Sequence, residues 1–113
     1  MPFINIKTNQ SVSTAQQEVI KSGLGKAISA LSGKSEQWLM VGIEPDYILY
    51  HQGSAHPCAM VEVQVYGNAS ASDCNKLTGH ISKLLHTELQ IPENRIYVSY
   101  TCTPNWGWNG SNF

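Results

Sequence analysis

The chain has 113 residues and a formal net charge of −1; 42% of its residues are hydrophobic and only 13% are charged. This length suits one domain with its own core, and a single arginine without basic clusters argues against a nucleic-acid partner. No apolar run could span a bilayer and the N-terminal segment lacks the apolar stretch of a signal peptide, so we expect a cytoplasmic protein without a membrane partner.

The first predicted element is a strand near the N-terminus, in which Ile4 and Ile6 alternate with polar residues. Pro2 directly follows the initiator Met1, and a small residue there normally allows the methionine to be removed. Pro2 would then carry a free secondary amine on a rigid ring. An ordinary α-amino group has a pKa of about 7.7–8.0, which burial or a nearby cation would lower. Pro2 is therefore a candidate general base.

A helix is predicted to follow, because apolar residues recur at helical spacing. Its apolar face consists of Ile20, Leu24, Ala27 and Ile28. Ser13 or Thr14 is suited to cap its N-terminus, and Gly33 is suited to end it. Gly23 and Gly25 lie inside this helix and weaken it; close packing against a sheet would explain both.

The first half ends with another strand pattern and a loop. Leu39, Val41 and Ile43 alternate at period two. The segment at residues 44–46 contains a proline and predicts a turn or kink. We expect a short strand at Tyr47–Tyr50, followed by a loop.

The second half repeats the pattern of the first at an offset of 57 residues. The second helix face consists of Leu77, Ile81, Leu84 and Leu85, and the matching strand positions are Val61, Val63, Ile96, Val98 and Tyr100. Ser70 or Ser72 is suited to cap this helix, and Pro92 follows it. The tail at residues 104–113 predicts a loop or short hairpin.

Two such units predict an α/β fold in one domain, residues 1–113, with an internal pseudo-repeat of about 1–56 and 57–113. We expect a four-stranded mixed sheet with both helices on one face, because right-handed crossovers place them together. The opposite face is expected to be polar and to meet water or a channel. Its residues are Asn5, Lys7, Glu62, Gln64, Tyr97 and Ser99. Other subunits would cover the exposed sheet edges.

Several short motifs, in one order along the chain, resemble the macrophage migration inhibitory factor family. They are Met1-Pro2-Phe3-Ile4, Gly33-Lys34, Pro57-Cys58-Ala59, Arg95-Ile96-Tyr97 and Gly107-Trp108-Asn109. The resemblance extends over nearly the whole chain. It implies a homotrimer in which three sheets surround a central solvent channel. It also implies keto–enol tautomerase activity at pockets between neighbouring subunits.

The resemblance also implies roles for individual residues. Pro2 matches the catalytic base, and Lys34 matches the lysine that binds the substrate carboxylate. Tyr66 falls where a backbone N–H binds substrate, and Tyr97 matches a pocket tyrosine from the adjacent subunit. Ser99 stands where the best-known members have asparagine. The pocket-wall positions are Trp106, Trp108 and Phe113, with Trp106 replacing a common valine.

The implied substrates are small aromatic 2-keto acids, such as phenylpyruvate, and dopachrome-like compounds. A base must move the proton, and Lys34 can hold the carboxylate as a point charge. This chemistry requires no metal or organic cofactor. Proton transfer by Pro2 is favoured over iminium formation, although the secondary amine permits both.

Cysteine placement excludes one activity known in this family. Some members carry a C-x-x-C pair for thiol–disulfide exchange, whereas Cys58 here has no second cysteine at that spacing. We therefore reject oxidoreductase activity of that type.

Two rival functions stay open. One is a secreted, cytokine-like protein that binds a cell-surface receptor and has a vestigial pocket, since the family leaves cells without a signal peptide. The other is a trimeric scaffold with no ligand.

Overall fold

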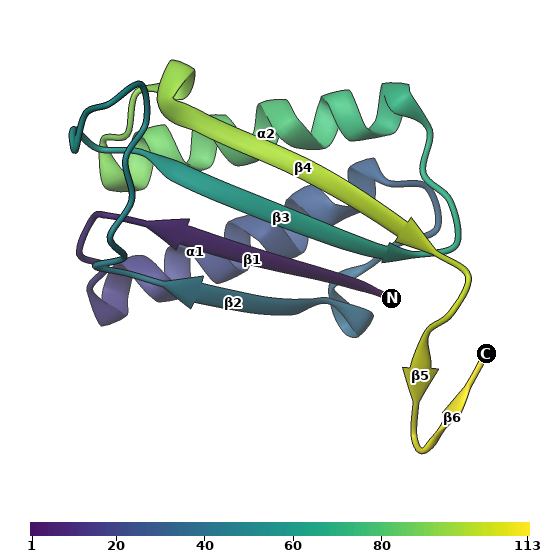
Figure 1. Ribbon diagram of the computed structural model, residues 1–113. Coiled ribbons are helices and arrows are strands. Elements are labelled where there is room, and N and C mark those ends of the chain that lie inside the picture. Colours follow the sequence, from purple (N-terminus) through teal and green to yellow (C-terminus); the bar gives the residue numbers. More distant parts are fainter.

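Both halves of the chain build the same strand–helix–strand unit in a computed structural model that describes residues 1–113. The first unit contains β1 (Pro2–Thr8), α1 (Thr14–Ala27) and β2 (Met40–Glu44), and the second contains β3 (Ala59–Tyr66), α2 (Ala71–Leu89) and β4 (Ile96–Thr103). A small hairpin of β5 (Gly107–Trp108) and β6 (Ser111–Asn112) ends the chain. Short 3₁₀ helices lie at Ile28–Ala30, Glu36–Trp38 and Glu93–Arg95. The expected duplication is visible in Figure 1.

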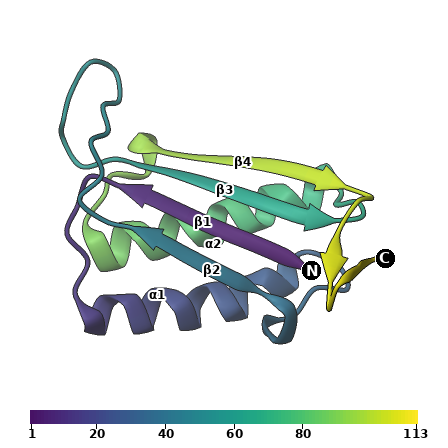
Figure 2. The ribbon, with the colours of Figure 1, turned by 60° about the horizontal axis from the view of Figure 1, so that its bottom comes forward.

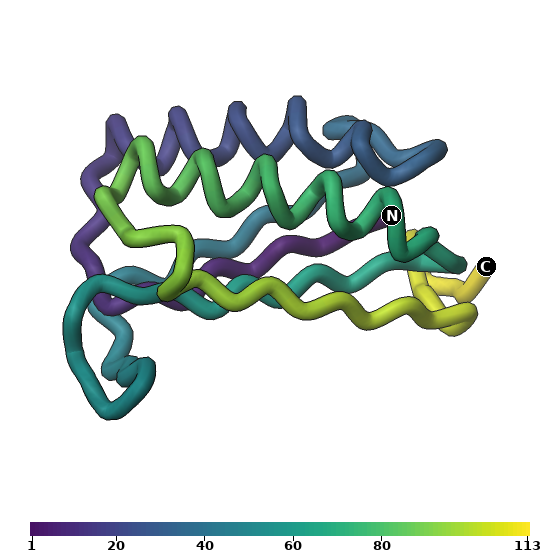
Figure 3. Tube along the Cα trace, turned by 90° about the horizontal axis from the view of Figure 1, so that it is seen from above, coloured from purple at the N-terminus to yellow at the C-terminus, as the bar shows by residue number.

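The sheet is mixed, as expected, and has the order β2-β1-β3-β4. Each unit pairs its own strands in parallel, while β1 and β3 join the units in antiparallel fashion. Both helices cover the same face of the sheet (Figure 3). The strands β2 and β4 are left as the two edges.

The core lies between the sheet and the helices. On β1 and β3 the residues facing the helices are buried in strict alternation with more exposed ones, as a one-sided sheet requires. The helix residues Ile20, Leu24, Leu77, Ile81 and Leu85 have no exposed surface. The 3.6-residue periodicity therefore identified the buried faces of both helices correctly.

The predicted N-terminal caps are confirmed. Ser13 accepts the backbone N–H of Gln16 at 3.1 Å, and the Gln16 side chain accepts the N–H of Ser13 at 2.9 Å, which completes a capping box. Ser70 caps α2 through the N–H of Asp73 at 3.1 Å. Gly33, however, does not end α1, because the α-helix stops at Ala27 and is followed by a 3₁₀ turn.

Gly33 and the helix glycines have other roles than expected. Gly33 has a φ of +78°, a left-handed conformation that suits glycine, and it turns the chain toward Lys34. A Cβ at Gly23 would lie 2.8 Å from Leu84 of α2, and one at Gly25 would collide with the Glu36 side chain. Close packing thus explains both glycines, but against α2 and the Glu36–Trp38 turn rather than against the sheet.

The expected strand at Tyr47–Tyr50 is wrong. After β2 the chain turns at Asp46, which has a φ of 54°. Within residues 45–50, only the N–H groups of Asp46 and Tyr47 donate to backbone carbonyls, those of Gln10 and Thr8. Because no strand lies alongside, the next residues form a loop. Asn9 and Arg95 hold this loop through its carbonyls; one example is the 2.9 Å bond from Arg95 Nε to the Pro57 oxygen.

The tail forms the hairpin that the sequence allowed. Asn109 and Gly110 have φ values of 53° and 86°, as expected for a two-residue turn with both central residues left-handed. The N–H of Phe113 donates to the Trp106 carbonyl at 3.0 Å.

No helix in the chain combines the length and the apolar character needed to cross a membrane.

Candidate active site

Pro2 lies at the start of β1, buried on the face that meets the helices. It is paired with Val65 near the end of β3. Met1 precedes it, and the Met1 carbonyl accepts the backbone N–H of Tyr66 at 3.0 Å. The end of β3 therefore lies directly beside the N-terminus.

Lys34 reaches the same place from the turn after α1. Its Nζ donates to the Tyr66 carbonyl at 3.0 Å. Partial burial, and secondarily the positive charge of Lys34, lower the pKa of the Met1 amino group below its ordinary value. Pro2, Lys34 and the Tyr66 backbone thus converge at one end of the sheet.

Aromatic rings gather at this end as well. Tyr66 lies 5.1 Å from Phe113 between ring centroids, and Phe113 stacks on Trp108 at 6.4 Å with their planes 10° apart. Figures 1 and 2 both place the β5–β6 hairpin beside the N-terminus. The expected wall residues Trp108 and Phe113 therefore lie together, and both are half-exposed.

Trp38 is a member of this cluster that the sequence did not reveal. Its ring meets Trp108 edge-on at 5.4 Å, and it sits on the 3₁₀ turn between Lys34 and β2. The only signal in the sequence is an aromatic residue four positions after Lys34. That spacing alone gives no reason to place it near the tail.

Trp106 lies apart from the stacked rings. Together with Phe3 and Met40 it lines a shallow cavity of about 410 Å³ at the edge of the open sheet face. Its backbone carbonyl still holds Phe113. Trp106 therefore positions the cluster through its backbone, while its side chain serves a neighbouring surface.

Tyr97 and Ser99 lie on the open face of β4, Tyr97 near the opposite end of the sheet and Ser99 near its middle. Tyr97 is paired with Met60 and Ser99 with Glu62, whereas Pro2 is paired with Val65. At 3.3–3.4 Å per residue these offsets correspond to about 17 and 10 Å. Neither side chain belongs with Pro2 of its own chain.

Residue Tyr97 is 60% exposed, and its ring packs edge-on against His51 with 4.8 Å between the ring centroids.

No metal-binding cluster accompanies these residues: nowhere do three His, Cys, Asp or Glu side chains gather suitably. Cys58 is buried at the other end of the sheet, where its carbonyl accepts the Thr8 hydroxyl at 2.8 Å. The chemistry available at the candidate site is therefore that of an amine, an ammonium, a backbone N–H and apolar rings. This set can bind an anionic aromatic molecule and move a proton.

Comparisons with known proteins show the family and the fold to which the chain is similar. The family model for macrophage migration inhibitory factor matches residues 1–113. The macrophage migration inhibitory factor of Xenopus laevis is 30% identical over 100% of this chain and 99% of its own. The crystal structure of Leishmania major MIF2 matches with a TM-score of 0.94 and 31% identity, covering 100% and 97% of the two chains. The Toxoplasma gondii factor gives 0.88 and 28%, covering 98% and 99%.

Proposed function

The chain belongs to the macrophage migration inhibitory factor family, and from this we propose that it is a cofactor-free keto–enol tautomerase of aromatic 2-keto acids, with Pro2 as base once Met1 is removed. The observation that carries the proposal is the convergence of Pro2, the Lys34 ammonium and the Tyr66 backbone at one end of the sheet. Phenylpyruvate-like and dopachrome-like compounds are the proposed substrates.

Removal of Met1 changes two groups at once. While Met1 is attached, the Pro2 nitrogen is part of an amide and has no basicity. The Met1 carbonyl also occupies the Tyr66 N–H. Loss of Met1 would therefore create the base and free a hydrogen-bond donor beside it.

The proposed reaction is a proton transfer within one bound molecule. Lys34 binds the carboxylate of the 2-keto acid, and the Tyr66 N–H donates to a substrate oxygen. Pro2 takes a proton from C3, the electrons of that C–H bond form the C2–C3 double bond, and the keto oxygen gains the negative charge. The protonated Pro2 then returns its proton to that oxygen, which gives the enol and restores the base.

The surroundings suit a base that works near neutral pH. Burial and the Lys34 charge lower the pKa of the Met1 amino group, and both would act on a free amine at Pro2, one residue further into the fold. The apolar rings of Trp108, Phe113 and Trp38 offer a wall for the aryl group. Trp106 would bound the site only if its side chain turned toward it.

The pocket is complete only in the proposed homotrimer. Tyr97 and Ser99 lie too far along the sheet to reach Pro2 of their own chain, so we assign them to the pocket of a neighbouring subunit. The unpaired edges β2 and β4 supply backbone groups with which subunits can pair.

A receptor-binding, cytokine-like homologue with a vestigial pocket is the alternative function. The Xenopus laevis relative is named for the inhibition of macrophage migration, which favours a signalling role. A vestigial pocket is disfavoured because Pro2, Lys34 and the Tyr66 backbone lie next to one another. Secretion without a signal peptide is compatible with either function.

The test compares two forms of the protein, identified by their intact mass. We expect the form lacking Met1 to tautomerise phenylpyruvate and the form retaining Met1 to be inactive. Pro2→Gly should lose the activity while keeping the fold, as judged by circular dichroism, and any receptor binding. Full activity in Pro2→Gly would refute the proposed base.

A further inference from the structure

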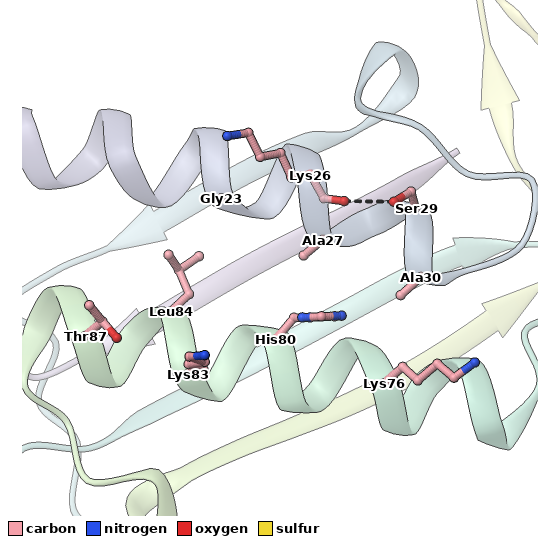
Figure 4. A pocket seen from close by; sticks show the side chains of 10 residues that line it. All are labelled: Gly23, Lys26, Ala27, Ser29, Ala30, Lys76, His80, Lys83, Leu84 and Thr87. Atoms are coloured by element: carbon pink, nitrogen blue, oxygen red, sulfur yellow. Dashed lines mark hydrogen bonds between the residues drawn. The ribbon is translucent and has the colours of Figure 1, made fainter.

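A groove of about 640 Å³ runs between α1 and α2, on the side of the helices that faces away from the sheet. Its volume falls in the range of small-molecule sites. Figure 4 shows Ala27, at the end of α1, and Ala30, in the following 3₁₀ turn, pointing into this groove. His80 and Leu84 point toward them from α2. The floor is made mainly of small and apolar side chains.

The rim of this groove is basic. Three of the chain's six lysines line it, Lys26 from α1 and Lys76 and Lys83 from α2, together with His80 and no acidic residue. The whole chain has a net charge of −1. The groove therefore concentrates positive charge that the composition does not lead one to expect.

These lysines form no ion pair in the fold. The ion pairs of the chain involve Lys7 and Lys21 instead, and Lys34 is bound to Tyr66. Asp73, the acid nearest in sequence to Lys76, is held by the N–H and hydroxyl of Ser32 at 3.1 and 2.9 Å. The Lys76 charge helps, after the Ser32 hydrogen bonds, to hold the pKa of Asp73 below its ordinary value, but none of the three ammonium groups is in contact with a carboxylate. All three can therefore contact an external anion.

Helix stabilisation explains only part of this pattern. Lys26 lies in the last turn of α1, where a cation interacts favourably with the helix dipole. Lys76 and Lys83 lie within the nineteen-residue α2, away from its C-terminal turn. Together with His80 they have the spacing i, i+4, i+7, which places all three on one side of the helix.

We propose that this groove is a second binding site, and that its ligand is a small polyphosphate. Lys76 and Lys83 are two turns apart, about 10.5 Å along the helix axis, so an anion with charges spread along its length can contact both. Lysine binds phosphate as a point charge. The lining has no aromatic ring of Phe, Tyr or Trp on which a base could stack and no arginine fork for a planar carboxylate.

The site is separate from the candidate active site. None of its lining residues is Pro2, Lys34, Tyr66 or a member of the aromatic cluster. Both helices cover the face of the sheet opposite to the open face. In the proposed trimer the groove would lie outside, accessible to solvent.

The test is calorimetric titration of the whole protein with tripolyphosphate at low salt, with orthophosphate as comparator. We expect tripolyphosphate to bind more tightly and its affinity to fall as salt rises. Lys76→Gln and Lys83→Gln should each weaken binding about threefold, and the double variant about tenfold. Lys21→Gln, the same charge change on an ion-paired lysine of α1, should leave the affinity unchanged.

Lys34→Gln distinguishes the groove from the tautomerase pocket. Tripolyphosphate affinity should survive this change, whether or not the protein proves to be a tautomerase. Loss of binding in Lys34→Gln with retention in the groove variants would assign the anion to the other pocket and overturn the proposal. Absence of any binding at low salt, or equal losses in Lys21→Gln and the groove variants, would also overturn it.

Discussion

The ammonium group of Lys34 has two neighbours at the candidate site. It donates a hydrogen bond to the carbonyl of Tyr66, and its charge helps to lower the pKa of the N-terminal amino group. In the proposed reaction it releases the carbonyl to bind the substrate carboxylate. Lys34→Gln keeps a polar side chain of similar shape but removes the charge. We expect kcat/KM for phenylpyruvate to fall about 10–100-fold, as for loss of a hydrogen bond to a charged group.

The control for this variant is Lys21→Gln, which changes the net charge equally at an exposed ion pair with Glu18. Its steady-state kinetics should match those of the unmodified protein. An unchanged kcat/KM in Lys34→Gln would show that Lys34 does not bind the substrate.

The ionisation of Pro2 gives a prediction about pH. Burial and Lys34 disfavour the charged form of an amine at this end of the sheet, so the pKa of a free Pro2 should lie below that of a fully exposed N-terminal proline. Activity needs the neutral amine, and therefore kcat/KM should rise with pH through that lowered pKa and then level off. Lys34→Gln should move the midpoint upward. A midpoint at or above the pKa of an exposed N-terminal proline in the Met1-free protein would contradict this account.

At the scale of elements, the capping box identifies which of two adjacent residues starts α1. The Ser13 side chain accepts the Gln16 N–H, whereas Thr14 is already helical. Ser13→Ala should lower the free energy of unfolding by about 1 kcal/mol, measured by urea denaturation. Thr14→Ala is the matched control and should not destabilise the protein, because alanine is the better helix former. A larger loss in Thr14→Ala would show that the cap had been assigned to the wrong residue.

Periodicity predicted the helices and the four main strands because each packs one face against the other layer; that face is fully buried on β1 and β3 and mostly partly buried on the edge strands β2 and β4. Ile4 and Ile6 alternate with polar residues, and Leu77 and Ile81 have helical spacing. Both patterns can be recognised without knowing which residues distant in sequence they contact, because each follows from the burial of one face. The prediction at Tyr47–Tyr50 failed for the opposite reason: a strand needs a neighbouring strand, and here the chain leaves the sheet at Asp46. The local sequence pattern does not show whether a neighbouring strand is present.

The candidate site was predictable only in part. Pro2 and Lys34 were identified by resemblance, and the structure adds that Lys34 and the residue before Pro2 both meet the backbone of Tyr66. Trp38 was not predicted because its contact with Trp108 joins segments about seventy residues apart. Contacts of this kind depend on where the tail folds back, which no local period encodes.

At the scale of the whole molecule, the distance between Pro2 and Tyr97 determines how many chains are needed to form a pocket that contains both residues. The two residues lie near opposite ends of the sheet, so a pocket containing both requires two chains. In a closed ring each chain would give Pro2 to one pocket and Tyr97 to the next. If Pro2 and Tyr97 act together as proposed, the smallest active unit is the assembly and not the single chain.

Complementation between two defective variants tests this arrangement. Pro2→Gly and Tyr97→Ala should each have low activity alone, the first lacking the base and the second lacking an aromatic contact. After denaturation together in equal amounts and refolding, about a quarter of the pockets should combine an intact Pro2 with an intact Tyr97 from the next chain. Phenylpyruvate tautomerisation should recover to about that fraction of the unmodified rate. The same variants refolded separately and then mixed serve as control, because without subunit exchange no intact pocket can form. If co-refolded trimers, verified by native mass spectrometry, stay as inactive as this control, Tyr97 does not act across the subunit boundary.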